Sequence, residues 1–226
     1  METFVEVQNT PYLQGASRLN LNPRASLDEA LADPACPNFL QQALQDKVVW
    51  QKRNEFHVGQ SLQSLGLAPQ WVGALLAWGA RVTLEDGSEH PLVELLETAR
   101  KPGDIAQVSL PLDVPGRCWA AARTGDTPKD FPIVWAMAVI DLDDGLVKDA
   151  RLALTGAWQK SVALTEAAEG LVGKPLDEEN IQTVSAAVEK EVTPKGDYRG
   201  SVEYRSAMAG VMTRRALTAC MEGENA

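Results

Sequence analysis

Histidine and cysteine are scarce in this chain of 226 residues, which has two histidines and three cysteines. Two histidines leave little material for an imidazole metal centre or a catalytic triad. The cysteines Cys36, Cys118 and Cys220 lie far apart and are odd in number, which argues against a disulfide framework and matches no zinc or iron–sulfur spacing. We expect three buried, reduced thiols and no metal site in this chain.

Long apolar runs and an excess of positive charge are also missing. The longest apolar stretches, residues 71–80 and 133–140, are far shorter than the roughly 20 residues needed to cross a bilayer. The first residues, METFVEVQ, carry two glutamates and no basic cluster, so they fit neither a secretory signal nor a transit peptide. With a net charge of −10, the chain is expected to be cytoplasmic and to bind neither nucleic acid nor membrane.

Sequence motifs of several enzyme classes are missing as well. No HExxH, CxxC, Walker A loop, GxSxG elbow or GxGxxG occurs, so hydrolase, kinase and Rossmann dehydrogenase functions lack support. His90 is interpreted as a solvated loop residue, whereas structural and functional roles are equally open for His57. The aspartates at 141–144 belong to a turn and the acidic residues at 177–179 to a helix start, so neither cluster is taken as a site.

The composition that remains, 45% hydrophobic and 23% charged, is that of a globular protein with one large domain or two small ones. Ser26 and Glu29 have the spacing of a capping box, which predicts a short helix running towards Asp33. Periodicity and turn residues predict the other elements of the first half. They are strands at 4–7, 19–22 and 81–84, helices at 37–52 and 71–80, and an irregular connection at 53–66.

Residues 101–104, Lys-Pro-Gly-Asp, form the clearest linker, and we expect a domain boundary there. Beyond it strands precede helices, which indicates an α+β domain with helices on one face of an antiparallel sheet. A tight turn at Asp144-Gly145 is expected to join two long strands. The other expected elements are strands at 105–112 and 119–123 and helices at 161–172, from 177 to before 193, and from 201. The last helix is expected to bury Tyr204, Met208, Val211, Met212, Ala216 and Ala219.

Three segments of the second half carry a family resemblance. They are ARLALTGAW (150–158), AEGLVGKPLDEENI (168–181) and YRGSVEYRSAMAGVMTRRAL (198–217). The last is similar to the ending D-x-R-G-S-x-E-Y-R, then V-x-x-R-R-A-L, of a known family. The chain resembles the flavin-binding medium subunit of the molybdenum hydroxylases, which include carbon monoxide dehydrogenase and xanthine dehydrogenase.

The resemblance implies an α+β fold with a truncated PCMH-type FAD-binding domain and a CO dehydrogenase flavoprotein C-terminal-like domain. Residues 1–100 are expected to be the second subdomain of the FAD-binding fold, and residues 104–226 the C-terminal-like domain. VEVQNTPYLQG and SRLNLNPRASLDEALADP resemble the strand, I-P-x-L-x-G turn, strand and short helix that open that subdomain. The family's first subdomain, which supplies a glycine-rich loop to the FAD pyrophosphate, is expected to be absent and would precede Met1.

The family's second FAD loop, R-N-x-x-T-x-G-G-N-L, reads RNEFHVGQSL at residues 53–62. His57 replaces the threonine, Gln60 the second glycine and Ser61 the asparagine, and a side chain at Gln60 would occupy space that the cofactor needs. The acid of the family's S-P-x-x-D is missing from residues 68–71. The lysine of its Y-x-K is missing from residues 119–121, whereas Asp130 keeps the later aspartate.

On this resemblance, the chain has no catalytic and no metal-binding residue of its own. Because cofactor features are altered while the RGSVEYR ending is intact, our leading hypothesis is a structural or docking subunit with weak or no FAD binding. Its partners would be an iron–sulfur subunit and a molybdopterin subunit, and its acidic, tryptophan-bearing surface would be the interface. The candidate cofactor-binding residues are Arg53, Asn54, His57, Gly59, Gln60, Ser61, Trp119 and Asp130.

Two alternatives stay open. In the first, another chain supplies the missing subdomain and completes an FAD site, so that this chain is at most the electron-transfer subunit of a molybdenum-dependent oxidoreductase. Gly59, Ser61, Trp119 and Asp130 would then line the isoalloxazine ring. In the second, the fold serves an unrelated ligand-binding or regulatory function with a different occupant of the flavin cleft, because a fold does not determine function.

Overall fold

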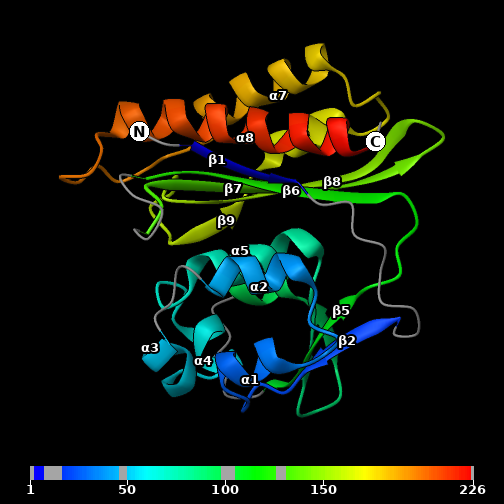
Figure 1. The fold of residues 1–226 in the computed structure, drawn as a ribbon, viewed down its shortest axis with the longest axis vertical. Helices are drawn as coiled ribbons and strands as arrows, with labels where there is room; N and C mark the ends of the chain where they lie inside the picture. The colour runs from blue at the N-terminus through cyan, green and yellow to red at the C-terminus, as the bar shows by residue number, and fades with distance from the viewer. Residues whose placement is uncertain (1–2, 8–16, 46–49, 98–104, 126–130, 225–226) are drawn as a thin grey trace. The chain divides into compact units, whose positions relative to one another are not determined.

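The computed structural model describes residues 3–7, 17–45, 50–97, 105–125 and 131–224 (Figure 1). The chain divides into two compact units: unit 1 contains residues 1–11 and 114–226, and unit 2 contains residues 12–113. Each unit has its own sheet and its own helices. Within the described ranges, no helix combines the length and the apolar character that crossing a membrane requires.

Unit 1 is built on a five-stranded antiparallel sheet with the strand order β1-β6-β7-β8-β9. The edge strand β1 comes from the start of the chain and pairs with β6, so segments far apart in the sequence share one sheet. The strands are β1 (Thr3–Val7), β6 (Arg117–Thr124), β7 (Val134–Asp143), β8 (Leu146–Thr155) and β9 (Val162–Leu164).

The hairpin of β7 and β8 confirms the expected pair of long strands. Asp143 faces Leu146 across a two-residue turn, in which Asp144 and Gly145 have φ angles of 50° and 76°. Positive φ at both central positions gives the turn type whose twist matches that of paired strands. Aspartate and glycine are among the residues that tolerate this backbone conformation, so the turn follows directly from the local sequence.

Two helices, α7 (Glu178–Glu191) and α8 (Val202–Glu224), lie along one face of this sheet (Figure 1). The side chains at even positions 134–140 of β7 and 150–154 of β8 form a buried apolar cluster with these helices. The expected α+β arrangement is therefore confirmed. Of the six α8 side chains expected on the buried face, three are fully buried and three are half-buried against the cluster: Met212, Ala216 and Ala219, then Tyr204, Met208 and Val211.

The helix expected over residues 161–172 is wrong in its first part. Val162–Leu164 form β9, which pairs with β8, and the helical part is the 3-10 helix η2 (Glu166–Leu171). The Glu191 carboxylate at the end of α7 accepts hydrogen bonds from the backbone N–H groups of Glu166 and Ala167, each at 2.9 Å, and so defines where η2 begins. Both interactions join segments distant in sequence, which local periodicity does not report.

Unit 2 contains a four-stranded antiparallel sheet with the order β2-β5-β3-β4. Its strands are β2 (Arg18–Leu21), β3 (Arg81–Leu84), β4 (Glu89–Pro91) and β5 (Ile105–Pro111). Its helices are α1 (Leu27–Ala32), α2 (Asn38–Gln45), α3 (Trp50–Glu55), α4 (Val58–Gln63), α5 (Pro69–Trp78) and α6 (Leu92–Glu97). The central helix α5 is buried from residue 70 to residue 78, as its apolar sequence predicts, and Trp78 stacks on Phe39 of α2 with 3.9 Å between the ring centroids.

Two predictions for unit 2 differ from the structure. The helix expected over 37–52 is present as α2 and α3, and residues 46–49 lie outside the described residues. The segment 53–66, expected to be irregular, contains the end of α3 and the whole of α4. Both of these short helices pack on distant segments, and such tertiary contacts stabilise helices that are too short to be stable in isolation.

The compact units also differ from the expected residue ranges 1–100 and 104–226. The strand β1 belongs to unit 1, and β5 belongs to unit 2 because it pairs with both β2 and β3. The expected linker at 101–104 lies outside the described residues. Strand pairing between distant segments thus places the first strand of each expected range in the unit formed mainly by the other range.

Candidate functional site

Residues 53–62, which resemble the family's second FAD loop and are here called the loop, comprise the end of α3, residues 56–57 and most of α4, and they lie next to the start of α1. Ser26 and His57 form an isolated antiparallel bridge, and the backbone N–H of Leu27 donates to the carbonyl of Phe56 at 2.9 Å. Ser26 is also the N-cap of α1, where its side chain and that of Glu29 form the predicted capping box. The bridge therefore fixes the loop against a helix start that is itself capped.

The backbone donors of this loop are hydrogen bonded within the chain. The N–H of Val58 donates to the carbonyl of Ala25 at 2.9 Å, and the N–H of Gly59 donates to the carbonyl of Pro23 at 2.8 Å. The N–H of His57 donates to Oε1 of the Gln60 side chain at 2.9 Å. A phosphate held at such a loop needs free N–H groups pointing at it. These three donors point at partners inside the protein instead.

Gln60, the residue that replaces the family's second glycine, also contacts the His57 ring. Its Oε1 atom lies 3.1 Å from Nδ1 of His57. One carboxamide oxygen therefore lies beside both the backbone N–H and the ring of His57.

Two small residues of the loop have structural explanations. A Cβ atom on Gly59 would lie 3.1 Å from the carbonyl oxygen and 3.3 Å from Cβ of Pro23, so glycine permits the close approach of α4 to that turn. Ser61 is fully buried and its hydroxyl donates to the carbonyl of Val58 at 2.6 Å. Both residues are accounted for by contacts within unit 2.

Arg53 and Asn54 also have partners in the chain. Nε of Arg53 lies 3.1 Å from Oδ1 of Asp28, which ties α3 to α1. The side-chain amide of Asn54 donates to the carbonyl of Trp50 at 3.0 Å, one turn earlier in α3. These contacts position α3, and they leave the loop's candidate residues engaged with the protein itself.

A pocket of about 390 Å³ opens beside the loop. Three of the candidate residues border it, together with polar side chains of the turn before α1 and of the strand region around β3. Its lining consists of Pro23, Arg24, His57, Gly59, Gln60, Gln63, Glu85 and Ile105. The structure thus brings His57, Gly59 and Gln60 together at one cavity, and the bonded loop amides beside it do not fit a cradle for the FAD pyrophosphate.

The remaining candidates lie elsewhere. Trp119 is buried on β6 of unit 1, and Asp130 lies outside the described residues. Among the residues that the structure describes, no group of three histidine, cysteine or acidic side chains is placed to hold a metal ion. The three cysteines are free and buried, as expected, and burial raises the pKa of the Cys36 thiol to about 12.

The prediction of a tryptophan-bearing surface is wrong. Five of the six tryptophan rings lie in the interior or at its edge, because large apolar side chains favour burial. Trp50, with 64% of its surface exposed, is the exception. The buried rings are Trp71, Trp78, Trp119 and Trp135, and Trp158 is half-buried.

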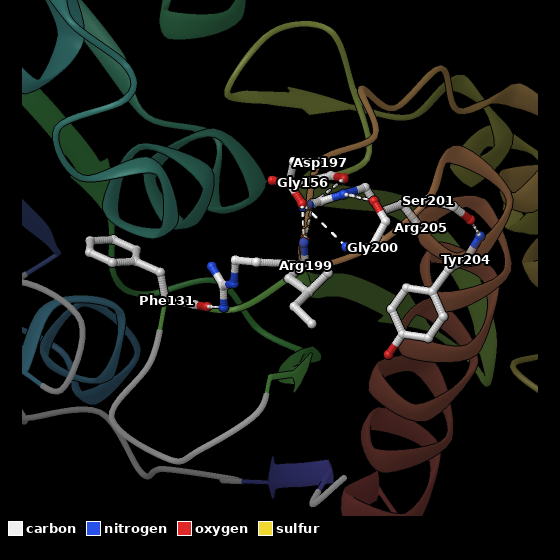
Figure 2. A network of polar contacts seen from close by, with 9 residues as sticks. Phe131, Gly156, Asp197, Arg199, Gly200, Ser201, Tyr204 and Arg205 are labelled. Atoms are coloured by element: carbon white, nitrogen blue, oxygen red, sulfur yellow. Dashed lines mark hydrogen bonds and ion pairs between the residues drawn. The ribbon is translucent and has the colours of Figure 1, made fainter.

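A second polar site, which the sequence analysis did not assign, surrounds Arg205 in the RGSVEYR segment (Figure 2). Arg205 is 6% exposed, and its guanidinium donates from Nη1 to the carbonyl of Ile133 at 2.7 Å and to that of Gly156 at 3.3 Å. Its Nη2 atom lies 2.7 Å from Oδ1 of Asp197. Arg205 therefore joins the start of β7, the end of β8 and the turn before α8. A charged residue on an apolar helix face was the sequence signal for this role.

Neighbouring residues of the segment reinforce this connection. The Arg199 guanidinium donates to the carbonyl of Phe131 before β7. A Cβ on Gly200 would lie 2.9 Å from Cδ1 of Tyr204, so the glycine lets the tyrosine ring pack over the turn. The Arg205 side chain and the Arg199 backbone N–H hold the pKa of Asp197 below its ordinary value. These contacts form a structural clamp that holds the start of α8 to the ends of β7 and β8.

The comparisons with known proteins agree with the fold. The family model of the CO dehydrogenase flavoprotein C-terminal domain matches residues 120–220. The chain is 31% identical over 121 residues to the carbon monoxide dehydrogenase medium chain of Afipia carboxidovorans, covering 53% of this chain and 42% of that protein. It is 23% identical over 174 residues to the glyceraldehyde dehydrogenase medium chain of Sulfolobus acidocaldarius, covering 74% and 62%. The chain thus spans less than two thirds of the length of either relative.

Solved structures show the same fold at low identity. Carbon monoxide dehydrogenase from Hydrogenophaga pseudoflava superposes with a TM-score of 0.78 at 22% identity, covering 96% of this chain and 78% of that chain. Quinoline 2-oxidoreductase from Pseudomonas putida 86 gives a TM-score of 0.74 at 20% identity with the same coverage.

Residues 120–220, which run from β6 to α8, therefore match the CO dehydrogenase flavoprotein C-terminal domain. Over this part and beyond it, the chain is similar to medium subunits of CO dehydrogenase-type molybdenum hydroxylases and shares their fold.

Proposed function

We propose that this chain is a structural or docking component of a cytoplasmic molybdenum-hydroxylase-type complex, with weak or no FAD binding. Its partners would be an iron–sulfur subunit and a molybdopterin subunit. One observation carries the proposal. The backbone N–H groups of residues 57–59, which a cofactor phosphate would need as donors, already donate to acceptors inside the chain. The clamp around Arg205 joins three segments of unit 1 and supports a scaffold role for this chain.

The complex itself tests this function. The chain is co-expressed with an iron–sulfur subunit and a molybdopterin subunit of this enzyme class, and the assembly is purified through a tag on the molybdopterin subunit. We expect the three chains to co-elute and the assembly to lack flavin in its absorbance spectrum and after acid extraction. Failure of the chain to co-elute would contradict the docking role. One flavin per chain would instead favour the alternative, an FAD site completed by another chain.

Two variants test whether the Gln60 side chain holds the backbone of the loop. Gln60→Ala removes the oxygen that accepts the His57 N–H, so we expect hydrogen exchange of that amide to be faster by about 10-fold, because an amide without its acceptor exchanges more readily. Gln63→Ala is the matched control, because the Gln63 side chain borders the same pocket and is not the acceptor of the His57 N–H. Unchanged exchange in Gln60→Ala would show that the carboxamide does not hold the loop.

A further inference from the structure

Tyr198 is the most exposed of the large apolar side chains that the structure describes, with 98% of its surface accessible to solvent. It lies in the turn Asp197–Gly200 that precedes α8. Within the turn, the N–H of Asp197 donates to the carbonyl of Gly200 at 3.0 Å, and the N–H of Gly200 donates to the carbonyl of Asp197 at 3.2 Å. A large ring thus projects from the tip of a closed turn.

The turn is fixed from beneath by the core of unit 1. Oδ1 of Asp197 accepts from the backbone N–H groups of Arg199 and Gly200 at 2.9 and 3.2 Å. The same oxygen accepts from Arg205 at 2.7 Å, and Arg205 is itself bonded to the carbonyls of Ile133 and Gly156 (Figure 2). The backbone under Tyr198 is therefore pre-organised, so binding through its ring loses little backbone entropy.

The surroundings of the ring are apolar and positively charged. Val202, the first residue of α8, is 45% exposed, and a Cβ on Gly196 would lie 3.4 Å from its side chain, which places the valine beside the turn. Lys195 and Arg199 flank Tyr198 in the sequence. Residues 195–205 contain three basic and two acidic residues, and one of the acids, Asp197, is neutralised by Arg205, in a chain whose net charge is −10.

We propose that Lys195, Tyr198, Arg199 and Val202, here called the Tyr198 surface, dock a partner subunit that presents an apolar pocket rimmed by carboxylates. Tyrosine buries 150–250 Å² when it is enclosed and is enriched among the residues that dominate binding energy. The local positive charge selects an acidic rim and speeds association. This proposal rests on the proposed docking function and names the part of the surface that performs it.

Affinity measurements on variants test the Tyr198 surface. The purified chain is titrated with the co-expressed iron–sulfur and molybdopterin subunits. We expect Tyr198→Ala to weaken binding about 10-fold or more, because truncating a central tyrosine commonly has this effect. Val172→Ala, at a valine that is 48% exposed elsewhere in unit 1, is the matched control and should bind as the unaltered chain does. Lys195→Glu should slow association about three-fold with little change in dissociation.

The outcomes separate the two proposals. If the unaltered chain binds none of these subunits, the docking function fails. If it binds them and Tyr198→Ala binds equally well, the Tyr198 surface alone is overturned. If the isolated chain self-associates through Tyr198, as sedimentation of Tyr198→Ala would reveal, the occupant is a second copy and the proposal is also overturned. Equal urea midpoints for the unaltered chain and for Tyr198→Ala show that the variant is folded.

Discussion

The polar networks of the two units differ in how many remote segments a single side chain joins. In unit 1, the Arg205 side chain connects Ile133, Gly156 and Asp197, which lie just before β7, just after β8 and in the turn before α8. In unit 2, the contacts of the loop are divided among separate groups: the Gln60 side chain serves His57, and a backbone hydrogen bond joins Gly59 to Pro23. When one side chain holds several remote elements, folding depends on that residue, whereas divided contacts tolerate the replacement of one side chain. We infer that this difference explains why the RGSVEYR ending keeps the family pattern and the loop at 53–62 does not.

The glycines in the two units show the same contrast. Gly156 has a φ of 74°, and a Cβ there would lie 2.0 Å from the carbonyl oxygen of Ile133 and 3.1 Å from the Arg205 guanidinium. Gly59 has an ordinary backbone conformation, and its added Cβ would meet Pro23 at 3.1 Å. The first position excludes any side chain, whereas the second requires a shift of a few tenths of an ångström.

Gly156→Ala is expected to have the largest effect, a loss of about 4 kcal/mol or more in the free energy of unfolding, because the clash involves backbone and breaks the clamp. Gly145→Ala is the matched control. Its φ is 76° but nothing lies within 4 Å of the added Cβ, so the left-handed backbone alone costs about 1–2 kcal/mol. Urea unfolding of both variants measures the difference, and equal losses would show that close approach at Gly156 is unimportant.

Arg205→Met is expected to lower the free energy of unfolding by about 3 kcal/mol, because two strand-end carbonyls lose their buried donor. Hydrogen exchange should accelerate at the start of β7 and of α8 while α1 and α5 keep their protection. Arg199→Met removes one hydrogen bond from a less buried arginine and should cost less than about 1 kcal/mol. If the two variants lost the same stability, the clamp would not depend on Arg205.

Ser26→Ala removes the capping box of α1 in unit 2 and is expected to cost about 1 kcal/mol, the usual effect of losing an N-cap side chain. Ser64→Ala, at the C-cap of α4, serves as the control. Faster hydrogen exchange should be confined to α1 and the loop bridged to Ser26. Exchange that accelerated throughout unit 2 would contradict the local character of this network.

The smallest expected effect is a dependence of stability on pH at Asp197. Hydrogen bonds from Arg205, then from the Arg199 backbone, lower the pKa of Asp197 in the folded state below its ordinary value of 3.8. The contribution to stability is therefore fully present above pH 3.8 and is lost as the pH falls through the lower folded value. Urea midpoints across this range should fall less steeply for Asp197→Asn. Identical slopes would contradict the linkage.

Local features of the sequence were sufficient to predict several elements. The Ser26–Glu29 capping box, the turn at Asp144-Gly145 and the helix start at Asp177 depend on residues close to one another, and the structure contains all three. Periodicity did not predict the β9 strand or the α4 helix, because both depend on partners remote in sequence. For the same reason it did not predict that β1 lies in unit 1 and β5 in unit 2. The candidate residues at 53–61, expected in an irregular segment, lie in α3, in α4 and in the two residues between them, and their hydrogen-bond partners at Pro23 and Ala25 required the tertiary structure.

The scarcity of histidine and cysteine limits the chemistry that this chain performs by itself, and the RGSVEYR ending carries its resemblance to the flavin-binding medium subunits. These properties depend on which residues are present and in what order. Whether the loop at 57–59 offers its N–H groups to a ligand depends on where carbonyls of other segments lie, and only the tertiary structure decides this. The reason is physical: a hydrogen bond is formed between groups that are close in space, whatever their separation in the sequence.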